Sequence, residues 1–469
     1  MEKVAYFNQP KLMQNAQNPC GGGDRGVTAP NFRGETPYPD TKTSGVSLSN
    51  PLPADTVSFK ANEETVATKE KKGLSKGAKW GIGIGTVALT GVGLFLALRK
   101  NLKNVTKIEE FFDKNIKLSN LPEKIEYKEA KTVDEAIEFT KKTFGIKHII
   151  GKKQDITLDA MNYINEGLTN VANANKGKIF IPTFIDFDRK MSENTLAGIY
   201  LLPQCYHFGT LSINPSFFNK EKLAKNIIFD LKMVSPRNFP VKYNTSPKYN
   251  ELFNKAKSDI NSLTTSELRY IFDVQQEFFQ KGVSIEKSDT TAALKIFKTE
   301  LENANIKFDI DEINKIKDKK LRFEKVSNIL KEYQDKTGKT LTCNIDVSPH
   351  ETLYHEIGHA MDLAKNYKTY IKEFTETRQD HFVSIFNSDM MKLFKENPEK
   401  FKLKYPKAFE FLTNQDIQST ANSLRFYSAT GIGDFIADVY AKMIAGEKLS
   451  DDVLALYKKY NGPLPVGYK

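Results

Sequence analysis

The sequence contains few cysteines, few histidines and a single tryptophan among its 469 residues. The three cysteines are Cys20, Cys205 and Cys343. Their odd number, wide separation and lack of a CxxC spacing argue against a disulfide framework and against a cysteine-based metal site. Histidine is also scarce, because the chain has only six, yet three of them lie within residues 350–359. We therefore expect the chemistry of this chain to centre on that segment.

Positive charge is unevenly distributed along the chain. The formal net charge is +11, and residues 69–107 contain nine Lys or Arg against one acid, Glu70. The rest of the chain is nearly balanced. A nucleic-acid-binding domain usually gathers its basic residues on one face, whereas here they flank an uncharged apolar segment. We therefore predict no nucleic-acid partner.

The apolar segment comprises residues 80–98, nineteen residues without a charged side chain. A helix of this length rises about 1.5 Å per residue and so nearly matches the hydrocarbon core of a bilayer. Trp80 and the flanking Lys and Arg residues suit the membrane interface. The segment predicts one transmembrane helix in a single-pass membrane protein. The flanking charges are similar on both sides, so the orientation stays open.

The chain before residue 217 contains two further parts, one on each side of the apolar segment. Residues 1–78 are rich in Pro, Gly, Ser and Asn without apolar periodicity, which predicts a disordered tail. Residues 104–216 contain two amphipathic helical segments and then three short segments rich in β-branched and aromatic residues. The three segments are KIFIPTFIDFD, LAGIYLLP and FGTLSINPSFF. They predict a small mixed sheet, and we expect GTLSIN, residues 209–214, to be its edge strand.

The second half of the chain is predicted to be mainly helical. Residues 217–338 are Lys-rich helical segments without a motif, and we interpret them as a helical insertion. Residues 339–469 begin with TLTCNIDV, which we interpret as a further strand, and then contain the histidine-rich segment. The predicted fold class is α+β, mostly helical with a small mixed sheet, plus the insertion and the transmembrane helix.

The segment SPHETLYHEIGHAMD, residues 348–362, has the pattern of a metal-binding helix. Ser348 and Pro349 suit the N-cap and the first helical position. His355 and His359 are four residues apart, so both imidazoles can face one metal ion, and Glu356 can reach a water on that ion. His350 lies outside this HExxH pattern and is predicted to be a surface residue of the first turn.

A zinc ion needs a third protein ligand and an open position for water. The spacing HExxHxxGxxH is absent, because Asp362 and Lys365 occupy the positions of its last Gly and His. A carboxylate from elsewhere is therefore required. In residues 426–446, Asp434 and Asp438 lie one turn apart with small residues between them, on a face that lets another helix approach closely. As alternatives, Asp434 is a helix N-cap and Asp438 is a surface charge.

The motifs HEIGHAMD and YSATGIGDFIADVYA resemble the catalytic core of the anthrax lethal factor type of gluzincin metallopeptidases, over roughly residues 350–445. The resemblance implies a zincin-like domain with one Zn²⁺ per chain. The implied ligands are His355, His359 and Asp434, with Asp438 supporting a ligand histidine and Tyr427 stabilising an oxyanion. Both acids are Asp where the family usually has Glu, so Asp438 stays an alternative ligand, and Asp362 is a less favoured support for a histidine.

The resemblance implies a zinc-dependent endopeptidase acting on a peptide or protein substrate, with Glu356 as the general base that deprotonates a zinc-bound water. With the predicted span, the enzyme would be anchored in a membrane. One alternative is a secreted toxin-like effector metalloprotease, in which the apolar segment serves translocation or processing. The other is a catalytically silent zincin-fold binding or scaffold protein. The presence of Glu356 argues against the scaffold.

Overall fold

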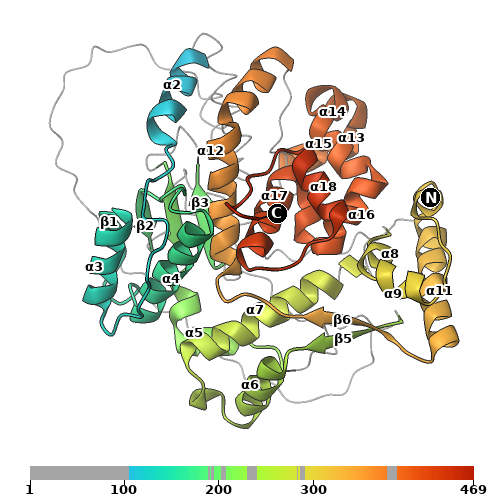
Figure 1. The fold of residues 1–469 in the computed structure, drawn as a ribbon, viewed down its shortest axis with the longest axis horizontal. Coiled ribbons are helices and arrows are strands. Elements are labelled where there is room, and N and C mark those ends of the chain that lie inside the picture. Colours follow the sequence, from blue (N-terminus) through green and yellow to red (C-terminus); the bar gives the residue numbers. More distant parts are fainter. Residues whose placement is uncertain are drawn as a thin grey trace, which may run out of the picture. The chain divides into compact units, whose positions relative to one another are not determined.

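The computed structural model describes residues 105–187, 191, 195–201, 208–229, 240–282, 284–285, 291–377 and 388–468. The described part is mostly helical and contains a small mixed sheet (Figure 1). The predicted disordered tail, residues 1–78, and the predicted transmembrane segment, residues 80–98, lie outside the described residues.

The membrane prediction is corrected by the helices of this structure. None of the helices in the described ranges is long and apolar enough to cross a bilayer, which contradicts the prediction of a single-pass membrane protein. The longest, α12 (Glu351–Thr377), has 27 residues, but Glu356, Asp362 and Lys365 place charges within its middle turns. Such charges suit a helix that packs on one face and meets polar groups on the other.

A four-stranded sheet lies beside α12. Its strands are β1 (His148–Ile150), β2 (Phe184–Asp186), β3 (Ala197–Tyr200) and β4 (Thr210–Ile213), in the spatial order β1-β2-β4-β3. Strands β1, β2 and β4 are parallel, and β3 is antiparallel to β4. The three predicted strand segments form β2, β3 and β4, whereas β1 was not predicted.

The predicted edge strand is wrong. GTLSIN forms β4, which lies between β2 and β3. All four residues of β4 are buried, as expected of an interior strand covered on both faces. The edge strand that contacts α12 is β3 (Figure 1).

Three helices precede or connect these strands. They are α2 (Val105–Asn115), α3 (Val133–Phe144) and α4 (Leu158–Ala174). Thr132 caps α3 by accepting the N–H of Glu135, and Gly145 ends it with a φ of 71°, in the left-handed region that glycine adopts without strain. Helix α4 packs against both α3 and α12. The two predicted helices of this part are confirmed as α3 and α4.

Residues 217–338 are mainly helical, but they also contain a strand. The helical elements are η4 (Pro215–Phe218), α5 (Lys220–Lys225), α6 (Pro247–Ser258), η6 (Ile260–Ser262), α7 (Thr265–Gly282), α8 (Ala292–Ile296), α9 (Lys298–Asn303), α10 (Ile310–Asn314) and α11 (Lys319–Thr337). The strand β5 (Val241–Thr245) pairs in parallel with β6 (Leu341–Ile345), the strand formed by TLTCNIDV. Strand β6 therefore joins β5 and not the four-stranded sheet.

The remaining elements follow α12 in the chain, and among them α17 packs against α12. They are α13 (Ser388–Glu396), α14 (Pro398–Lys404), α15 (Pro406–Thr413), α16 (Gln415–Leu424), η8 (Tyr427–Thr430), α17 (Ile432–Ile444) and α18 (Asp451–Lys459). Helices α12 and α17 pack closely, because a Cβ added at Gly358 would meet the Ala437 backbone at 3.1 Å. The prediction of a small-residue face that admits another helix is confirmed at Ala437.

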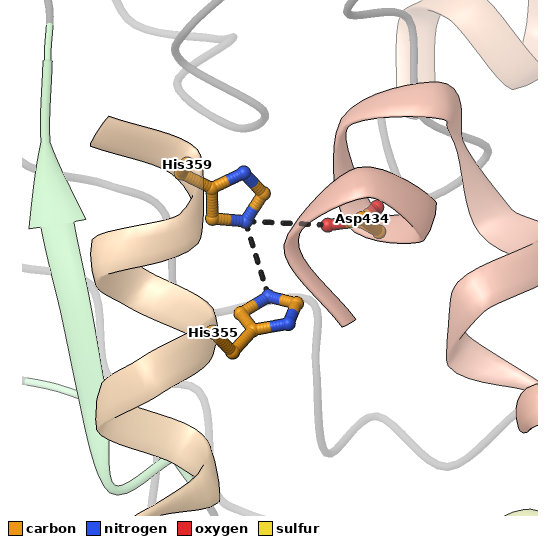
Figure 2. A group of neighbouring side chains, drawn as sticks. All are labelled: His355, His359 and Asp434. Carbon is orange, nitrogen blue, oxygen red and sulfur yellow. Dashed lines mark hydrogen bonds and ion pairs between the residues drawn. The ribbon is translucent and has the colours of Figure 1, made fainter. Parts of the chain in front are cut away.

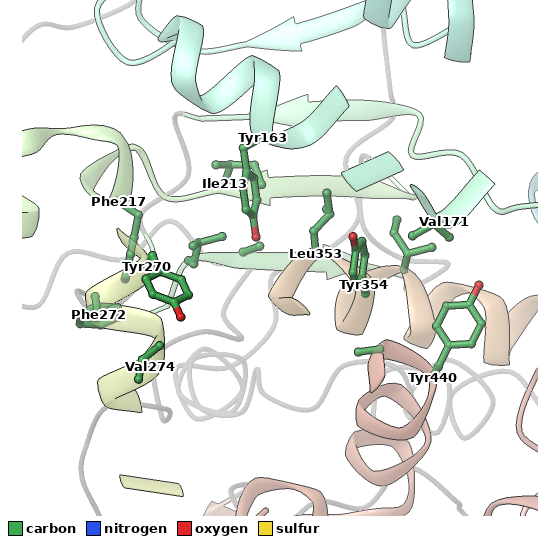
Figure 3. Close-up of a cluster of buried hydrophobic side chains, with 14 of the residues drawn as sticks. Tyr163, Val171, Ile213, Phe217, Tyr270, Phe272, Val274, Leu353, Tyr354 and Tyr440 are labelled. Carbon is green, nitrogen blue, oxygen red and sulfur yellow. The ribbon is translucent and has the colours of Figure 1, made fainter. Parts of the chain in front are cut away.

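A hydrophobic core fixes α12 against both the sheet and α17. Leu353 and Tyr354 of α12 lie among Val171 of α4, Ile213 of β4 and Tyr440 of α17 (Figure 3). The side chains of Leu353, Val171 and Ile213 are fully buried. Burial of large apolar side chains contributes about 1.5–3 kcal/mol each, so this face of α12 holds the histidine-bearing face in a defined place.

Candidate metal centre

His355 and His359 of α12 meet Asp434 of α17 at one point (Figure 2). The two histidine Nε2 atoms lie 3.1 Å apart, and His359 Nε2 lies 3.8 Å from Asp434 Oδ1. Ligands about 2.0–2.2 Å from one tetrahedral ion are separated by roughly 3.3–3.6 Å. The three side chains therefore have the spacing of a metal-binding group.

The start of α12 differs from the predicted capping. The helix begins at Glu351, two residues later than Pro349, and the Glu351 N–H donates to the Ser348 carbonyl over 3.1 Å. The Glu351 carboxylate forms ion pairs with Lys442 and Arg425. The offset leaves His355 and His359 on the same helical face.

Asp434 lies in the first turn of α17, where one carboxylate oxygen is fixed and the other faces the histidines. The Thr430 hydroxyl donates to Asp434 Oδ2 over 2.9 Å, and Oδ1 is the atom nearest His359. Gly431 is the N-cap of α17 and Asp434 follows it by three positions, so the N-cap alternative is wrong. Burial raises the pKa of Asp434 to about 6.

Asp438 contacts the opposite side of the His355 ring. Its Oδ1 lies 2.6 Å from His355 Nδ1, and its Oδ2 accepts a hydrogen bond from Ser428 over 2.7 Å. The side chain is 0% exposed, so the surface-charge alternative is wrong. By engaging Nδ1, Asp438 leaves Nε2 of His355 directed at the metal-binding group.

The pKa values of the two histidines move in opposite directions. Burial disfavours a charged imidazole at His355, but the adjacent Asp438 carboxylate outweighs it and raises the pKa. Burial, reinforced by His355, lowers the pKa of His359 to about 3. The pKa of Asp438 itself is lowered, because Arg425 and His355 outweigh the effect of its burial. At neutral pH His359 is thus a neutral imidazole, the form that binds metals.

Glu356 connects this group with the edge strand. Its Oε2 accepts a hydrogen bond of 2.9 Å from the backbone N–H of Ile199 in β3. Burial raises the pKa of Glu356 to about 7, which suits a group that accepts and releases a proton near neutral pH.

Tyr427 lies at the same site. Its ring centroid is 5.7 Å from that of His355, and its phenol hydrogen-bonds Asp434. Burial raises the pKa of Tyr427 well above its ordinary value, so the phenol remains protonated and can donate a hydrogen bond. The structure thus brings the five predicted site residues and Asp438 into one region.

Two other predictions for polar residues of α12 and its start are wrong. His350 is buried, stacks on Tyr163 at a centroid distance of 4.8 Å and pairs with Glu166 over 3.4 Å. Asp362 accepts hydrogen bonds from Tyr370 and Asn366, and its contacts thus lie away from the ligand histidines.

Sequence reasoning missed the residues that support the site from outside the two motifs. They are Ile199, Glu277, Gln280 and Arg425. Of these, only Arg425 carried a usable signal, since it lies two residues before Tyr427. The other three come from β3 and α7, which no spacing in the sequence connects to α12.

Comparisons of the chain with protein-family models, with curated proteins and with solved structures found no match. The site is therefore interpreted from its own geometry. Two imidazoles and a carboxylate within metal-binding distance are compatible with a metal ion, and this arrangement alone does not identify which metal.

Proposed function

We propose that this protein is a zinc-dependent endopeptidase, similar to the lethal factor type of gluzincins in its HExxH helix and in its second acidic helix. The observation that carries the proposal is the convergence of His355, His359 and Asp434 with Glu356 and Tyr427 at one site. A site that only bound a metal would not require a carboxylate with a pKa near 7 beside it.

The donor set favours zinc. Two imidazole nitrogens and one carboxylate oxygen form the three-ligand set of many catalytic zinc sites, which keep a fourth position open. A zinc ion held by His355, His359 and Asp434 would supply a Lewis acid and lower the pKa of a bound water to about 7. Asp434 has a shorter side chain than glutamate, and the close packing of α12 and α17 at Gly358 and Ala437 compensates for this.

The surrounding residues fit the steps of peptide hydrolysis. Glu356 accepts a proton from the attacking water and transfers it to the leaving amine. Tyr427 donates a hydrogen bond to the oxyanion of the tetrahedral intermediate. Asp438 holds His355 in the tautomer that presents Nε2.

Strand β3 offers a place for an extended substrate. Tyr200 and Leu196 accept backbone hydrogen bonds from the β4 side, so the alternate residues Ala197 and Ile199 direct their backbone groups away from β4. The Ile199 N–H already points to Glu356. A peptide that adds to this edge would lie beside the metal centre, and backbone pairing would give affinity with little sequence preference.

The test is to measure metal content and peptide cleavage for the full-length protein and for single variants. We expect about one zinc per chain and cleavage of a mixed peptide library in the parent. Glu356→Gln should retain zinc and lose cleavage by at least a hundredfold, since general acid–base catalysis contributes about 10²–10⁴. His359→Ala should lose both zinc and cleavage. His148→Ala, on an exposed residue of β1, is the control and should change neither.

Unchanged turnover in Glu356→Gln would remove this residue from the mechanism. A parent protein that binds zinc and cleaves no peptide would favour the silent binding protein, and absence of metal after supplementation would overturn the metal centre itself.

A further inference from the structure

A buried network of charged side chains lies behind the metal centre, with Arg425 at its middle. Arg425 Nη2 forms an ion pair with Asp438 Oδ1, the same oxygen that contacts His355. Its Nη1 lies 3.1 Å from Glu351 Oε1 and 3.5 Å from Glu277 Oε2. Glu277 belongs to α7, so a continuous chain of contacts runs from α7 to a ligand histidine.

Lys442 of α17 completes this network. Its Nζ lies 3.0 Å from Glu351 Oε1, 3.8 Å from Glu277 Oε1 and 2.9 Å from Glu447 Oε1. The side chains of Glu277 and Lys442 are 3% and 4% exposed. Charges buried to this degree are tolerated only when they are paired, so each member restricts the positions of the others.

Helix α7 also holds the segment between α16 and η8. Gln280, three residues after Glu277, accepts the backbone N–H of Tyr427 through Oε1 over 3.0 Å. Lys281 donates to the carbonyls of Ser423 and Leu424 at the end of α16. Both Arg425 and Tyr427 therefore lie on a short connection that α7 contacts at three neighbouring side chains.

We propose that α7 is a positioning element of the metal centre and acts at two points. Glu277, through Arg425 and Asp438, fixes the orientation of His355 as a metal ligand, and Gln280 fixes Tyr427 beside the metal-binding group. The first point requires only the metal centre, whereas the second rests on the proposed peptidase function. The region that sequence interpretation treated as an insertion thus contributes to the site.

The geometry explains why removal of the Glu277 carboxylate should lower metal affinity. One oxygen of Asp438 serves both His355 and Arg425, so its position depends on where the guanidinium lies. Without Glu277, Arg425 is free to shift toward Glu351, and Asp438 loses part of the constraint on its plane. Loss of a group that orients a ligand histidine lowers metal affinity by about 10–100-fold.

The experiment uses the full-length protein. Different measurements test the effect of Glu277 on His355 and the effect of Gln280 on Tyr427. Zinc affinity is measured by competition with a chromogenic chelator, the ligand geometry by the absorption spectrum of the cobalt(II)-substituted protein, and kcat and KM with a library-derived peptide. Glu277→Gln should lower zinc affinity about tenfold and shift the cobalt spectrum. Arg425→Lys keeps the charge but loses the paired guanidinium contacts, and it should do the same.

Gln280→Met should leave zinc affinity and the cobalt spectrum unchanged and lower kcat severalfold at constant KM. Glu332→Gln, on an exposed residue of α11, and Gln276→Met, elsewhere on α7, are the matched controls. Parental zinc affinity and cobalt spectrum in both Glu277→Gln and Arg425→Lys would overturn the first point. Parental kcat in Gln280→Met would overturn the second. A parent without peptidase activity would remove the second point together with the proposed function, while the zinc and cobalt measurements still decide the first.

Discussion

Two groups of buried carboxylates lie on opposite sides of the His355 ring and differ in how their charge is compensated. On the Nδ1 side, Asp438 belongs to a network in which every carboxylate forms an ion pair with Arg425 or Lys442. On the Nε2 side, Asp434 and Glu356 form no ion pair with a lysine or arginine of the described residues.

The pKa values follow this difference. Arg425 and His355 overcome burial and lower the pKa of Asp438, whereas burial raises the pKa of Asp434 to about 6 and that of Glu356 to about 7. On the Nδ1 side, each carboxylate of the network has Arg425 or Lys442 as a partner. The group on the Nε2 side lacks a cation, which a bound metal ion would supply.

The two sides of His355 should differ most in how strongly they affect metal affinity. Asp434→Ala removes one of the expected ligands and should weaken zinc binding roughly a thousandfold, about a quarter to two fifths of a typical binding free energy of about 10–16 kcal/mol. Asp438→Ala removes only the support of His355 and should weaken it about 10–100-fold. Chelator competition measures both, and the reverse order would exchange the roles of the two aspartates.

The next effect is on the stability of the metal-free protein, where the order of the two positions should invert. Asp438→Asn leaves the buried Arg425 without its closest partner and should destabilise the fold by about 3–5 kcal/mol. Asp434 has a pKa raised in the folded state, so its ionisation costs stability above its unfolded pKa, and Asp434→Asn should leave the protein equally or more stable at pH 7.5. Denaturant titration in the presence of a chelator measures this. Equal losses at both positions would contradict the distinction.

The chemistry of the Nε2 side was predictable because its residues lie within two short motifs. Helical spacing alone places His355 and His359 on one face of their helix. It places Asp434 and Asp438 together on one face of a second helix. The distinction between the two aspartates was not determined by spacing, because either one can face α12 when a helix rotates slightly. Packing of Gly358 on Ala437 sets that rotation.

The Nδ1 side was not predictable, since its partners are far apart in sequence. Glu277 lies 148 residues before Arg425, and on α7 it has the pattern of an ordinary polar helix residue. The edge strand was misassigned for a related reason. Strand order depends on long-range pairing, and the buried pattern of β4 indicates an interior strand only when its neighbours are known.

The hydropathy of residues 80–98 predicted a single-pass membrane protein, which the described helices contradict.

A smaller effect concerns pH. Metal binding on the Nε2 side must displace protons from Asp434, whose pKa is about 6, and from His355, whose pKa is raised. Both groups are increasingly protonated as the pH falls below 6, so zinc affinity should decrease at least tenfold per pH unit there. His359, with a pKa of about 3, should add nothing to this dependence above pH 4. Affinity that stays constant from pH 7 to pH 5 would contradict the binding of the metal by Asp434 and His355 with these raised pKa values.

The smallest expected effect tests whether the distance between α12 and α17 changes the zinc affinity of the Nε2 side without destabilising the fold. In Gly358→Ala the new Cβ would lie 3.1 Å from the Ala437 backbone and 3.2 Å from the Tyr440 ring, so α17 must move outward by a few tenths of an ångström. Asp434 spans the gap with a short side chain, so zinc affinity should fall a fewfold. The replacement of glycine by alanine within a helix favours folding by about 1 kcal/mol, which offsets the strain and keeps the fold stable.

Gly338→Ala is an unsuitable control because Gly338 has a φ of 67°. Ala364→Gly, farther along α12, changes the same methyl group in reverse, and its zinc affinity should match the parent. Equal affinity in Gly358→Ala and the parent would mean that Asp434 reaches the metal without help from the close helix packing.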